Sequence, residues 1–352
     1  DHNGTGTSTN DRTTLTSYTN NWTPSLFIDD NATLNIASGM LASATFGVGP
    51  SPNNSTFIRG GTLNFGTREG IISNQNYWLR LTDGVYGTNN FEIQSRITGS
   101  GGVTKIGAPS VVFDAANNYT GVTTINEGIL FARNGRSALG QGGVGNGISI
   151  QSTGELRLTN GLFIGSANAP KDIQVGVLVN DGQQILRSEN GNNYFYGDII
   201  YDNVDSVMHA NPASRPRITA NTNQALTIVG DIYGGTSAVT EDSYYSGSRI
   251  ITLEGAGFIN IRGQIGDRGV GGNARAAATT ITAGKGTATL TNQNQLFRLH
   301  IASNQDLNVT LDRQYNAAGR LALDQGVLII NYDPAAAGND GNGFWTTEAI
   351  TK

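Results

Sequence analysis

The chain has 352 residues, of which 37% are hydrophobic and 14% are charged, with 48 glycines, 8 prolines and no cysteine. The absence of cysteine excludes disulfides, thiolate metal sites and cysteine nucleophiles. The net charge is −5 and the 22 basic residues form no cluster, which argues against nucleic acid and anionic membranes as partners. No apolar stretch approaches the ~18 to 20 residues that span a bilayer, so we expect no direct membrane insertion by this chain.

The first 21 residues are almost all Thr, Asn, Ser, Gly and Asp. This composition predicts a flexible or strand-donating N-terminal arm, residues 1–21. Thr13, Leu15 and Tyr18 are its candidate assembly residues, because this short stretch has good strand propensity. From residue 22 to residue 352 the strand pattern continues without a linker, which predicts one elongated domain.

A short unit recurs along the chain, in which a glycine precedes a strand of alternating apolar residues. Its copies are residues 61–65, 128–131, 154–158, 257–261 and 326–330. The period of two indicates strands, and no segment has convincing helical periodicity. Because such a strand cannot bury its single apolar face alone, we expect an all-β solenoid of stacked, irregular rungs with loop insertions.

The same pattern predicts which side chains line the interior of the solenoid. We expect the following residues to point inward: Leu63, Phe65, Ile125, Leu130, Leu156, Leu158, Ile259, Ile261, Leu328 and Ile330.

One stretch resembles a known family. Residues 97–107, 111–113, 117–130 and 137–140 follow one another with the order and spacing of the autotransporter-associated β-strand repeat. The resemblance covers residues 91–140, and a degraded copy extends over 283–330. The family occurs in passenger regions of bacterial autotransporters and in large bacterial surface proteins.

The resemblance implies a right-handed parallel β-helix that is exported and displayed at the cell surface, with no active site in the repeat itself. It therefore implies an extracellular or cell-surface location. The chain opens with Asp1 and not with a charged and apolar leader, so we expect a mature or excised segment without its signal peptide.

Parallel β-helices also host polysaccharide lyases and glycosidases, which need two or three carboxylates on adjacent rungs. The candidate pairs are Asp29 with Asp30, Asp202 with Asp205, and Glu241 with Asp242. Acidic residues are mostly exposed, so the favoured interpretation is that these are solvated turn carboxylates. We therefore predict no catalytic residue and no enzyme. The alternative is a carbohydrate-active β-helix, either a polysaccharide lyase or glycosidase or a glycan-binding spike.

Metal and cofactor sites are not predicted either. His2, His209 and His300 are isolated from one another, and residues 339–343 lack the residue order of a calcium loop. The glycine-rich strings at 99–102 and 140–147 open no helix, which argues against phosphate binding.

Aromatic residues cluster in two polar stretches, at Tyr194 and Tyr196 and at Tyr244 and Tyr245. Exposed tyrosines could contact surface glycans or proteins, since they offer area at low entropic cost. Alternatively, Tyr194 and Tyr196 form the outer face of a strand whose Phe195 lies in the core.

These patterns predict a non-enzymatic, structural or adhesive β-solenoid, either a cell-surface stalk or the subunit of an extracellular fibre. The terminal rungs of a solenoid expose unpaired backbone groups, and neither end carries a helical cap. We therefore expect copies to join end to end by strand addition. The alternative is that adjoining rungs of a longer polypeptide cover these ends.

Overall fold

The structure is a computed structural model of the chain. It describes the backbone of residues 13–17, 25–48, 55–79, 86–88, 90–176, 183–201, 217–230, 232–234, 250–255, 257–261, 265–267, 277–281, 287–290, 294–301, 308–311, 315–316, 320–323 and 327–330. It describes the side chains of residues 26–43, 55–76, 90–176, 183–200, 217–230, 232 and 257–259.

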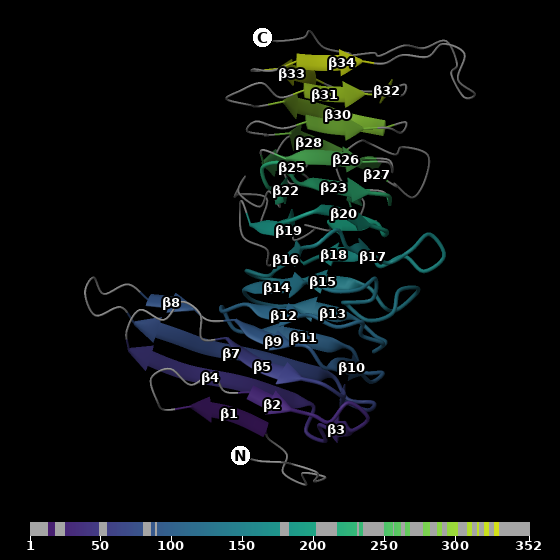
Figure 1. Cartoon of the computed structure of the whole chain (residues 1–352). Coiled ribbons are helices and arrows are strands. Elements are labelled where there is room, and N and C mark those ends of the chain that lie inside the picture. The colour runs from purple at the N-terminus through teal and green to yellow at the C-terminus, as the bar shows by residue number, and fades with distance from the viewer. Residues whose placement is uncertain are drawn as a thin grey trace, which may run out of the picture. The chain divides into compact units, whose positions relative to one another are not determined.

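Every regular element in these described ranges is a β-strand, and the chain divides into two compact units, Asp1–Lys171 (unit 1) and Asp172–Lys352 (unit 2). Within each unit the strands, apart from the antiparallel β8 of unit 1, pair in parallel, so that successive turns of the chain lie side by side (Figure 1). This is the architecture of a parallel β-solenoid, and it confirms the predicted all-β fold class.

Unit 1 has three parallel sheets. Sheet A contains β1 (Thr13–Ser17), β4 (Met40–Val48), β7 (Gly70–Leu79), β11 (Val103–Ile106), β13 (Thr123–Ile125) and β15 (Ile148–Ile150). Sheet B contains β2 (Ser25–Phe27), β5 (Thr56–Arg59), β9 (Phe91–Ile93), β12 (Val111–Phe113), β14 (Ile129–Ala132) and β16 (Glu155–Leu158). Sheet C contains β3 (Thr33–Asn35), β6 (Thr62–Asn64) and β10 (Arg96–Thr98), and β17 (Phe163–Ile164) follows sheet B's last strand in this unit.

Unit 2 repeats the design with three series of parallel strands. The first is β18 (Ile173–Val175), β21 (Ile199–Tyr201), β24 (Ile232–Gly234) and β27 (Ile265–Asp267). The second is β19 (Gln184–Ser188), β22 (Arg217–Ala220), β25 (Ile250–Gly255), β28 (Ala277–Ile281) and β30 (Asn294–Ile301), with β32 (Tyr315–Asn316) and β33 (Arg320–Leu323) both on β30. The third is β20 (Asn192–Phe195), β23 (Ala225–Ile228), β26 (Phe258–Ile261), β29 (Thr287–Leu290), β31 (Asn308–Leu311) and β34 (Val327–Ile330).

The rungs differ in length, as the irregular spacing of the sequence units predicts. On sheet A, Val103 pairs with Gly70 on one side and with Thr123 on the other. Thr123 in turn pairs with Ile148. The sheets keep their register across these unequal rungs because the extra residues lie in the connections between strands.

Alternating burial along the strands builds the core. Strands β5 and β11 both alternate between buried and half-buried residues, so one face of each points inward. Of the predicted interior residues whose side chains are described, all are buried: Leu63, Phe65, Ile125, Leu130, Leu156, Leu158 and Ile259. Ile261 lies in β26, and Leu328 and Ile330 lie in β34, but their side chains are outside the described set.

In residues 91–140, the stretch that resembles the family, the turn between β12 and β13 contains no strand of sheet C. A buried side-chain amide, that of Asn117, connects the neighbouring turns there. Asn117 is 1% exposed, accepts a hydrogen bond from the Ile97 N–H at 2.7 Å and donates one to the Ala138 carbonyl at 2.6 Å. The side chain thus joins three successive turns of the chain. A buried amide with both ends bonded fixes the position of each turn.

A glycine is required between β13 and β14. Gly128 has a φ of +64°, a conformation that L side chains rarely adopt. A Cβ atom at this position would also collide with the carbonyl group of Ala108 on the preceding rung. This explains the glycine in the turn Asn126-Glu127-Gly128, which the sequence analysis matched to the family.

The predicted N-terminal arm is partly described. Thr13 and Leu15 lie in β1, which pairs in parallel with β4 of the same chain. Tyr18 and the proposed boundary between residues 21 and 22 lie outside the described residues. The division into an arm and a single domain over 22–352 stays a prediction.

Two strands of sheet A, β4 and β7, extend beyond the part of the sheet in which β7 pairs with β11. Strand β7 pairs with β11 only along residues 70–73, whereas β4 and β7 stay paired up to Val48 and Leu79. Strand β8 (Tyr86–Thr88) then folds back antiparallel on the end of β7 (Figure 1). We call residues 43–48, 74–79 and 86–88 the paddle.

Candidate interaction surface

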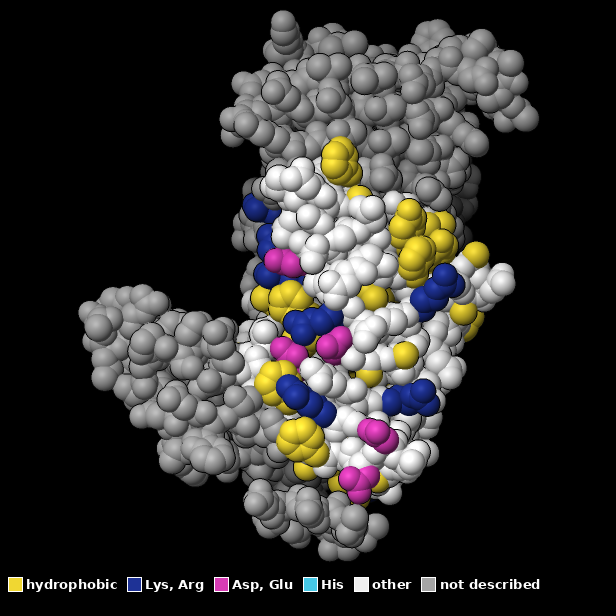
Figure 2. Space-filling view, viewed as in Figure 1, with side chains coloured by type: hydrophobic (Ala, Val, Ile, Leu, Met, Phe, Trp, Pro, Cys, Tyr) yellow, Lys and Arg dark blue, Asp and Glu magenta, His cyan; other side chains and the backbone are white. Residues whose placement is uncertain are grey.

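The outer face of sheet B in unit 1 carries a row of residues in register. Phe57, Glu92, Val112, Phe131 and Arg157 pair in sequence across β5, β9, β12, β14 and β16. Their side chains therefore share one face of the sheet. Figure 2 shows basic, acidic and hydrophobic side chains interleaved on unit 1.

Three arginines, Arg59, Arg133 and Arg157, contact aromatic rings and carboxylates in and beside this row. We call the residues joined by these contacts the arginine strip: Phe57, Arg59, Glu92, Asp114, Phe131, Arg133, Glu155 and Arg157. The Arg59 guanidinium carbon lies 4.2 Å from the ring centroid of Phe57, and that of Arg157 lies 5.4 Å from that of Phe131. At these separations the cation is attracted to the face of the ring.

Each carboxylate of the strip contacts an arginine. Arg157 Nε and Nη2 donate to the two oxygens of Glu155 at 2.9 and 3.0 Å. Arg133 Nη1 lies 3.2 Å from Glu92 Oε2 and 3.9 Å from Asp114 Oδ2. The paired charges make the strip polar but locally balanced.

Glu92 and Asp114 are the carboxylates that the sequence analysis missed. They follow one another on neighbouring rungs, the arrangement that a carbohydrate-active β-helix needs. The signal was an acidic residue on the outer side of a buried strand, at Phe91-Glu92-Ile93 and after Val111–Phe113. Their shared contact with Arg133 favours an ion-pair role over an acid and base pair.

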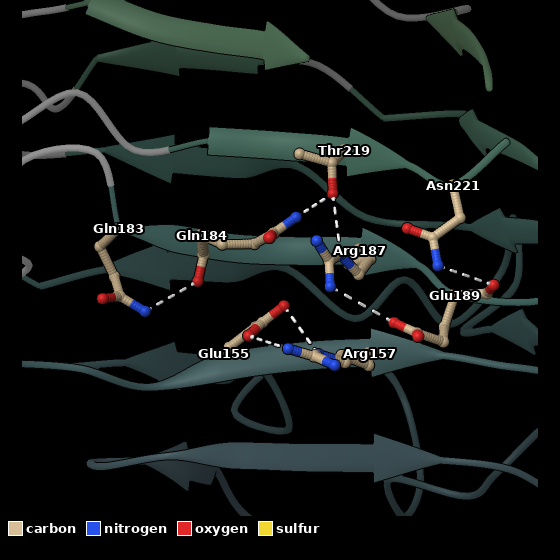
Figure 3. A network of polar contacts seen from close by, with 8 residues as sticks. All are labelled: Glu155, Arg157, Gln183, Gln184, Arg187, Glu189, Thr219 and Asn221. Atoms are coloured by element: carbon tan, nitrogen blue, oxygen red, sulfur yellow. Dashed lines mark hydrogen bonds and ion pairs between the residues drawn. The ribbon is translucent and has the colours of Figure 1, made fainter. Parts of the chain in front are cut away.

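Unit 2 carries a polar network of its own (Figure 3). Arg187 Nε on β19 donates to Thr219 Oγ1 on β22 at 3.3 Å, and Arg187 Nη1 lies 3.6 Å from Glu189 Oε2. The Asn221 amide donates to the Glu189 carbonyl at 3.1 Å. Side chains therefore reinforce the backbone pairing of these two strands.

Two lysines of unit 1 are buried. Lys105 Nζ on β11 donates to the carbonyls of Gly107 and Glu127, and the residue is fully buried. Burial lowers the pKa of Lys105 to about 7, although the nearby charge of Glu127 acts in the opposite direction. Lys105 joins two rungs and is shielded from any ligand.

Lys171 is the second buried lysine of unit 1. Its Nζ donates to the carbonyls of Gln141 and Asn146 at 3.0 and 2.6 Å, and burial lowers its pKa to about 7. The ring centroid of Tyr119 lies 5.9 Å from this Nζ. Burial raises the pKa of the Tyr119 hydroxyl, which bonds Thr123 Oγ1 at 2.8 Å.

Buried hydroxyl and amide groups fill the root of the paddle. Asn76 Nδ2 donates to Thr56 Oγ1 at 3.3 Å, and Ser43 Oγ donates to Asn76 Oδ1 at 3.1 Å. Asn74 Nδ2 donates to the Ser110 carbonyl at 2.5 Å. These bonds connect β7 to β4, to β5 and to Ser110, the residue directly before β12. They lie where β4 and β7 begin to extend beyond β11.

The tyrosine cluster at β20 shows the alternation of a strand. Phe195 is fully buried, and Tyr194 and Tyr196 are half-buried. This agrees with the interpretation that places Phe195 in the core. A contact role for the two tyrosines stays a prediction, and Tyr244 and Tyr245 lie outside the described residues.

The structure does not place the other acidic and histidine candidates of the sequence analysis in a functional site. Asp29 and Asp30 are exposed in the turn that follows β2. His300 lies in β30, where only the backbone is described. The remaining candidates lie outside the described residues: Asp202, Asp205, Glu241, Asp242, His2, His209 and residues 339–343.

The described part of the chain also lacks two features that would point to other functions, a metal cluster and a membrane-spanning helix. No three of its His, Asp and Glu side chains are grouped so that they could hold a metal ion. No helix in it is long and apolar enough to cross a membrane.

The chain is similar to a bacterial autotransporter adhesin. Over 225 residues it is 29% identical to the adhesin BmaC autotransporter of Brucella suis biovar 1 (strain 1330). The aligned segment covers 60% of this chain but only 6% of the adhesin, so the chain spans a small part of that protein's length. No family model and no solved structure matches.

This similarity agrees with the sequence-based resemblance and supports it at the level of an autotransporter-like surface protein.

Proposed function

We propose that this chain is a non-enzymatic adhesive β-solenoid that acts outside the cell, as part of a cell-surface stalk. The observation that carries the proposal is its similarity to an autotransporter adhesin over 60% of its length. A stack of parallel rungs suits this role, since each rung supports its neighbours and extends the surface on which ligands are held.

The contacts of unit 1 support a structural role for its charged residues. The carboxylates of the arginine strip contact arginines, and the buried Lys105 and Lys171 donate to backbone carbonyls. Such groups are held in place by hydrogen bonds and ion pairs that join neighbouring strands. They hold neighbouring strands together and stiffen the solenoid.

The alternative is a carbohydrate-active enzyme, and one observation favours it. Glu92 and Asp114 occupy neighbouring rungs on one face of unit 1, within reach of the same arginine. Two carboxylates on adjacent rungs could supply an acid and a base for glycan cleavage.

An adhesion assay combined with an activity survey separates the two functions. Beads coated with the chain are expected to bind cultured epithelial cells or matrix proteins more strongly than albumin-coated beads. The soluble chain is expected to leave neutral and acidic polysaccharides intact. Depolymerisation that is abolished by Glu92→Gln or Asp114→Asn, but not by the exposed-residue control Asp29→Asn, would identify an enzyme.

We also propose that copies associate end to end. Strands β1, β2 and β3 are the last members of sheets A, B and C in unit 1, and an edge strand presents backbone groups for pairing. In such an assembly, β1 of one copy would add to an edge strand of its neighbour. A head-to-tail contact of this kind does not close and would extend into a fibre.

Deletion of residues 1–21 tests the assembly. The full chain is expected to form fibres visible by electron microscopy and to sediment as large species, whereas the truncated chain stays small at equal concentration. Leu15→Pro is a milder variant, because proline removes a backbone donor from β1. Equal fibre formation by all three proteins would show that the arm donates no strand.

A further inference from the structure

We propose that Asn134 is a modification site, at which the folded chain spontaneously converts asparagine into an aspartyl or isoaspartyl residue. The reaction is fastest where glycine follows the asparagine, because the next backbone nitrogen is the nucleophile and glycine carries no Cβ to hinder it. Among the residues that the structure describes, asparagine precedes glycine at 134–135, 146–147, 160–161 and 190–191. The hydrogen bonds around these pairs differ, and they single out the first.

The only co-reactant is water. Hydroxide removes the proton of the Gly135 nitrogen, which attacks Cγ of Asn134. The N–Cγ bond forms, the Cγ–Nδ2 bond breaks, and the amide nitrogen leaves as ammonia after taking a proton from water, which regenerates the hydroxide. Water then opens the five-membered succinimide ring. Opening at the side-chain carbonyl gives aspartate, opening at the backbone carbonyl gives isoaspartate, and either product adds one negative charge.

The two reacting groups of the first pair are unbonded. Asn134 lies in the turn that follows β14 and is exposed. Within the described part of the chain its side chain makes no hydrogen bond, and the Gly135 N–H donates to no backbone carbonyl. Both groups can therefore reach the geometry of attack without first breaking a contact.

Asn146, in contrast, is held at both ends of its amide. Its Oδ1 accepts a hydrogen bond from the Gly121 N–H at 2.6 Å, and its Nδ2 donates to the Gly142 carbonyl at 3.0 Å. Attack by the Gly147 nitrogen requires the side chain to rotate, which breaks these bonds. The net contribution of two such bonds corresponds to a reaction about tenfold or more slower than at Asn134.

The other two pairs are protected in different ways. Asn190 is exposed, but the Gly191 N–H, which supplies the nucleophile, donates to Oε1 of Gln224. Asn160 is also exposed, and its Nδ2 donates to the Arg133 carbonyl at 3.4 Å, the longest of these contacts. We therefore expect Asn160 to react more slowly than Asn134.

Deamidation at Asn134 changes a turn that connects two rungs. Downstream in this turn, the Ser137 carbonyl accepts a hydrogen bond from the Asn117 N–H at 3.1 Å, and the Ala138 carbonyl accepts one from Asn117 Nδ2 at 2.6 Å. Isoaspartate lengthens the backbone of the turn by one methylene group. The new negative charge also lies next in sequence to Arg133 of the arginine strip.

Mass spectrometry of the aged protein tests the proposal. Cleavage after glutamate releases one peptide, Gly128–Glu155, which contains both Asn134 and Asn146 and so carries its own control. After incubation of the folded chain in mildly alkaline buffer, deamidation at Asn134 is expected to be about tenfold or more faster than at Asn146. In urea the two rates are expected to become similar, because the fold alone protects Asn146.

Two variants test the role of the local contacts. Gln224→Ala releases the Gly191 N–H and is expected to speed deamidation at Asn190 about three- to tenfold, with no change at Asn134. Asn134→Gln is expected to remain unmodified at this position, since its reaction would have to form a less favourable six-membered ring.

Three results would overturn the proposal. The first is equal deamidation of Asn134 and Asn146 in the folded chain. The second is an Asn134 that stays intact in the folded chain but reacts in urea, which would mean that the turn protects it. The third is an unchanged rate at Asn190 in Gln224→Ala, which would show that these hydrogen bonds do not control the reaction.

Discussion

Replacing Leu130 with Ala is expected to lower the free energy of unfolding by about 2 to 5 kcal/mol. Leu130 lies on β14 and is fully buried. It pairs in register with Val111 on one side and Leu156 on the other, which are also fully buried. Truncation would leave a cavity between two rungs that the stacked backbone prevents from collapsing.

Urea unfolding followed by circular dichroism measures this loss, provided that the transition is cooperative. Val144→Ala is the matched control, because Val144 is fully exposed in a loop and its truncation is expected to change stability by less than ~0.5 kcal/mol. A loss of similar size in both variants would mean that Leu130 does not belong to a packed core.

The inward face of the strands was predictable because it depends on local information. The glycine before each unit and the alternation after it identified Leu63, Leu130 and Leu158 as interior residues, and all three are fully buried. A pattern with period two assigns each side chain to a face without any knowledge of the neighbouring strand.

The partners across rungs were not predictable in this way. Arg133 contacts Glu92, which lies 41 residues before it in the chain. Which residues meet depends on the length of every intervening loop, and these lengths vary from rung to rung. The arginine strip therefore emerged only with the register of β9, β12 and β14.

The paddle was hidden for a related reason. In the sequence, residues 73–76 of β7 are polar and could equally have formed a loop. The pairing of β7 with β4 and β8 brings together three strands that are separated by insertions. The same holds for Lys105, since a single lysine in a strand is normally exposed and only the carbonyls of Gly107 and Glu127 allow its burial.

The free energy of unfolding is expected to rise as the pH is raised from about 7 toward 10. The pKa of Lys105 is lowered from 10.5 to about 7 in the folded chain, chiefly by burial. Between these two values the unfolded chain holds a proton that the folded chain has released, so stability increases with pH. This contribution of Lys105 to the free energy of unfolding is complete above its pKa in the unfolded chain. It is lost as the pH falls through its pKa in the folded chain.

Lys171 contributes in the same direction, because burial lowers its pKa to about 7 as well. Each fully released proton adds about 1.4 kcal/mol per pH unit within this window. The raised pKa of Tyr119 acts in the opposite direction above its usual value of 10.0, so the measurements belong between about pH 7.5 and pH 9.5.

Urea titrations of the unsubstituted chain, Lys105→Met, Lys171→Met and the double variant would separate these contributions. Each single variant is expected to lower the slope of stability against pH by about 1.4 kcal/mol per unit, and the double variant to lose both contributions. Methionine keeps the length of the apolar stem but removes the titrating amine, so the slope of stability against pH, and not the stability at one pH, is the quantity to compare. If stability changes with pH in the same way in all four proteins, Lys105 and Lys171 keep their protons in the folded chain. In that case the hydrogen bonds to backbone carbonyls offset the cost of burying the two charges.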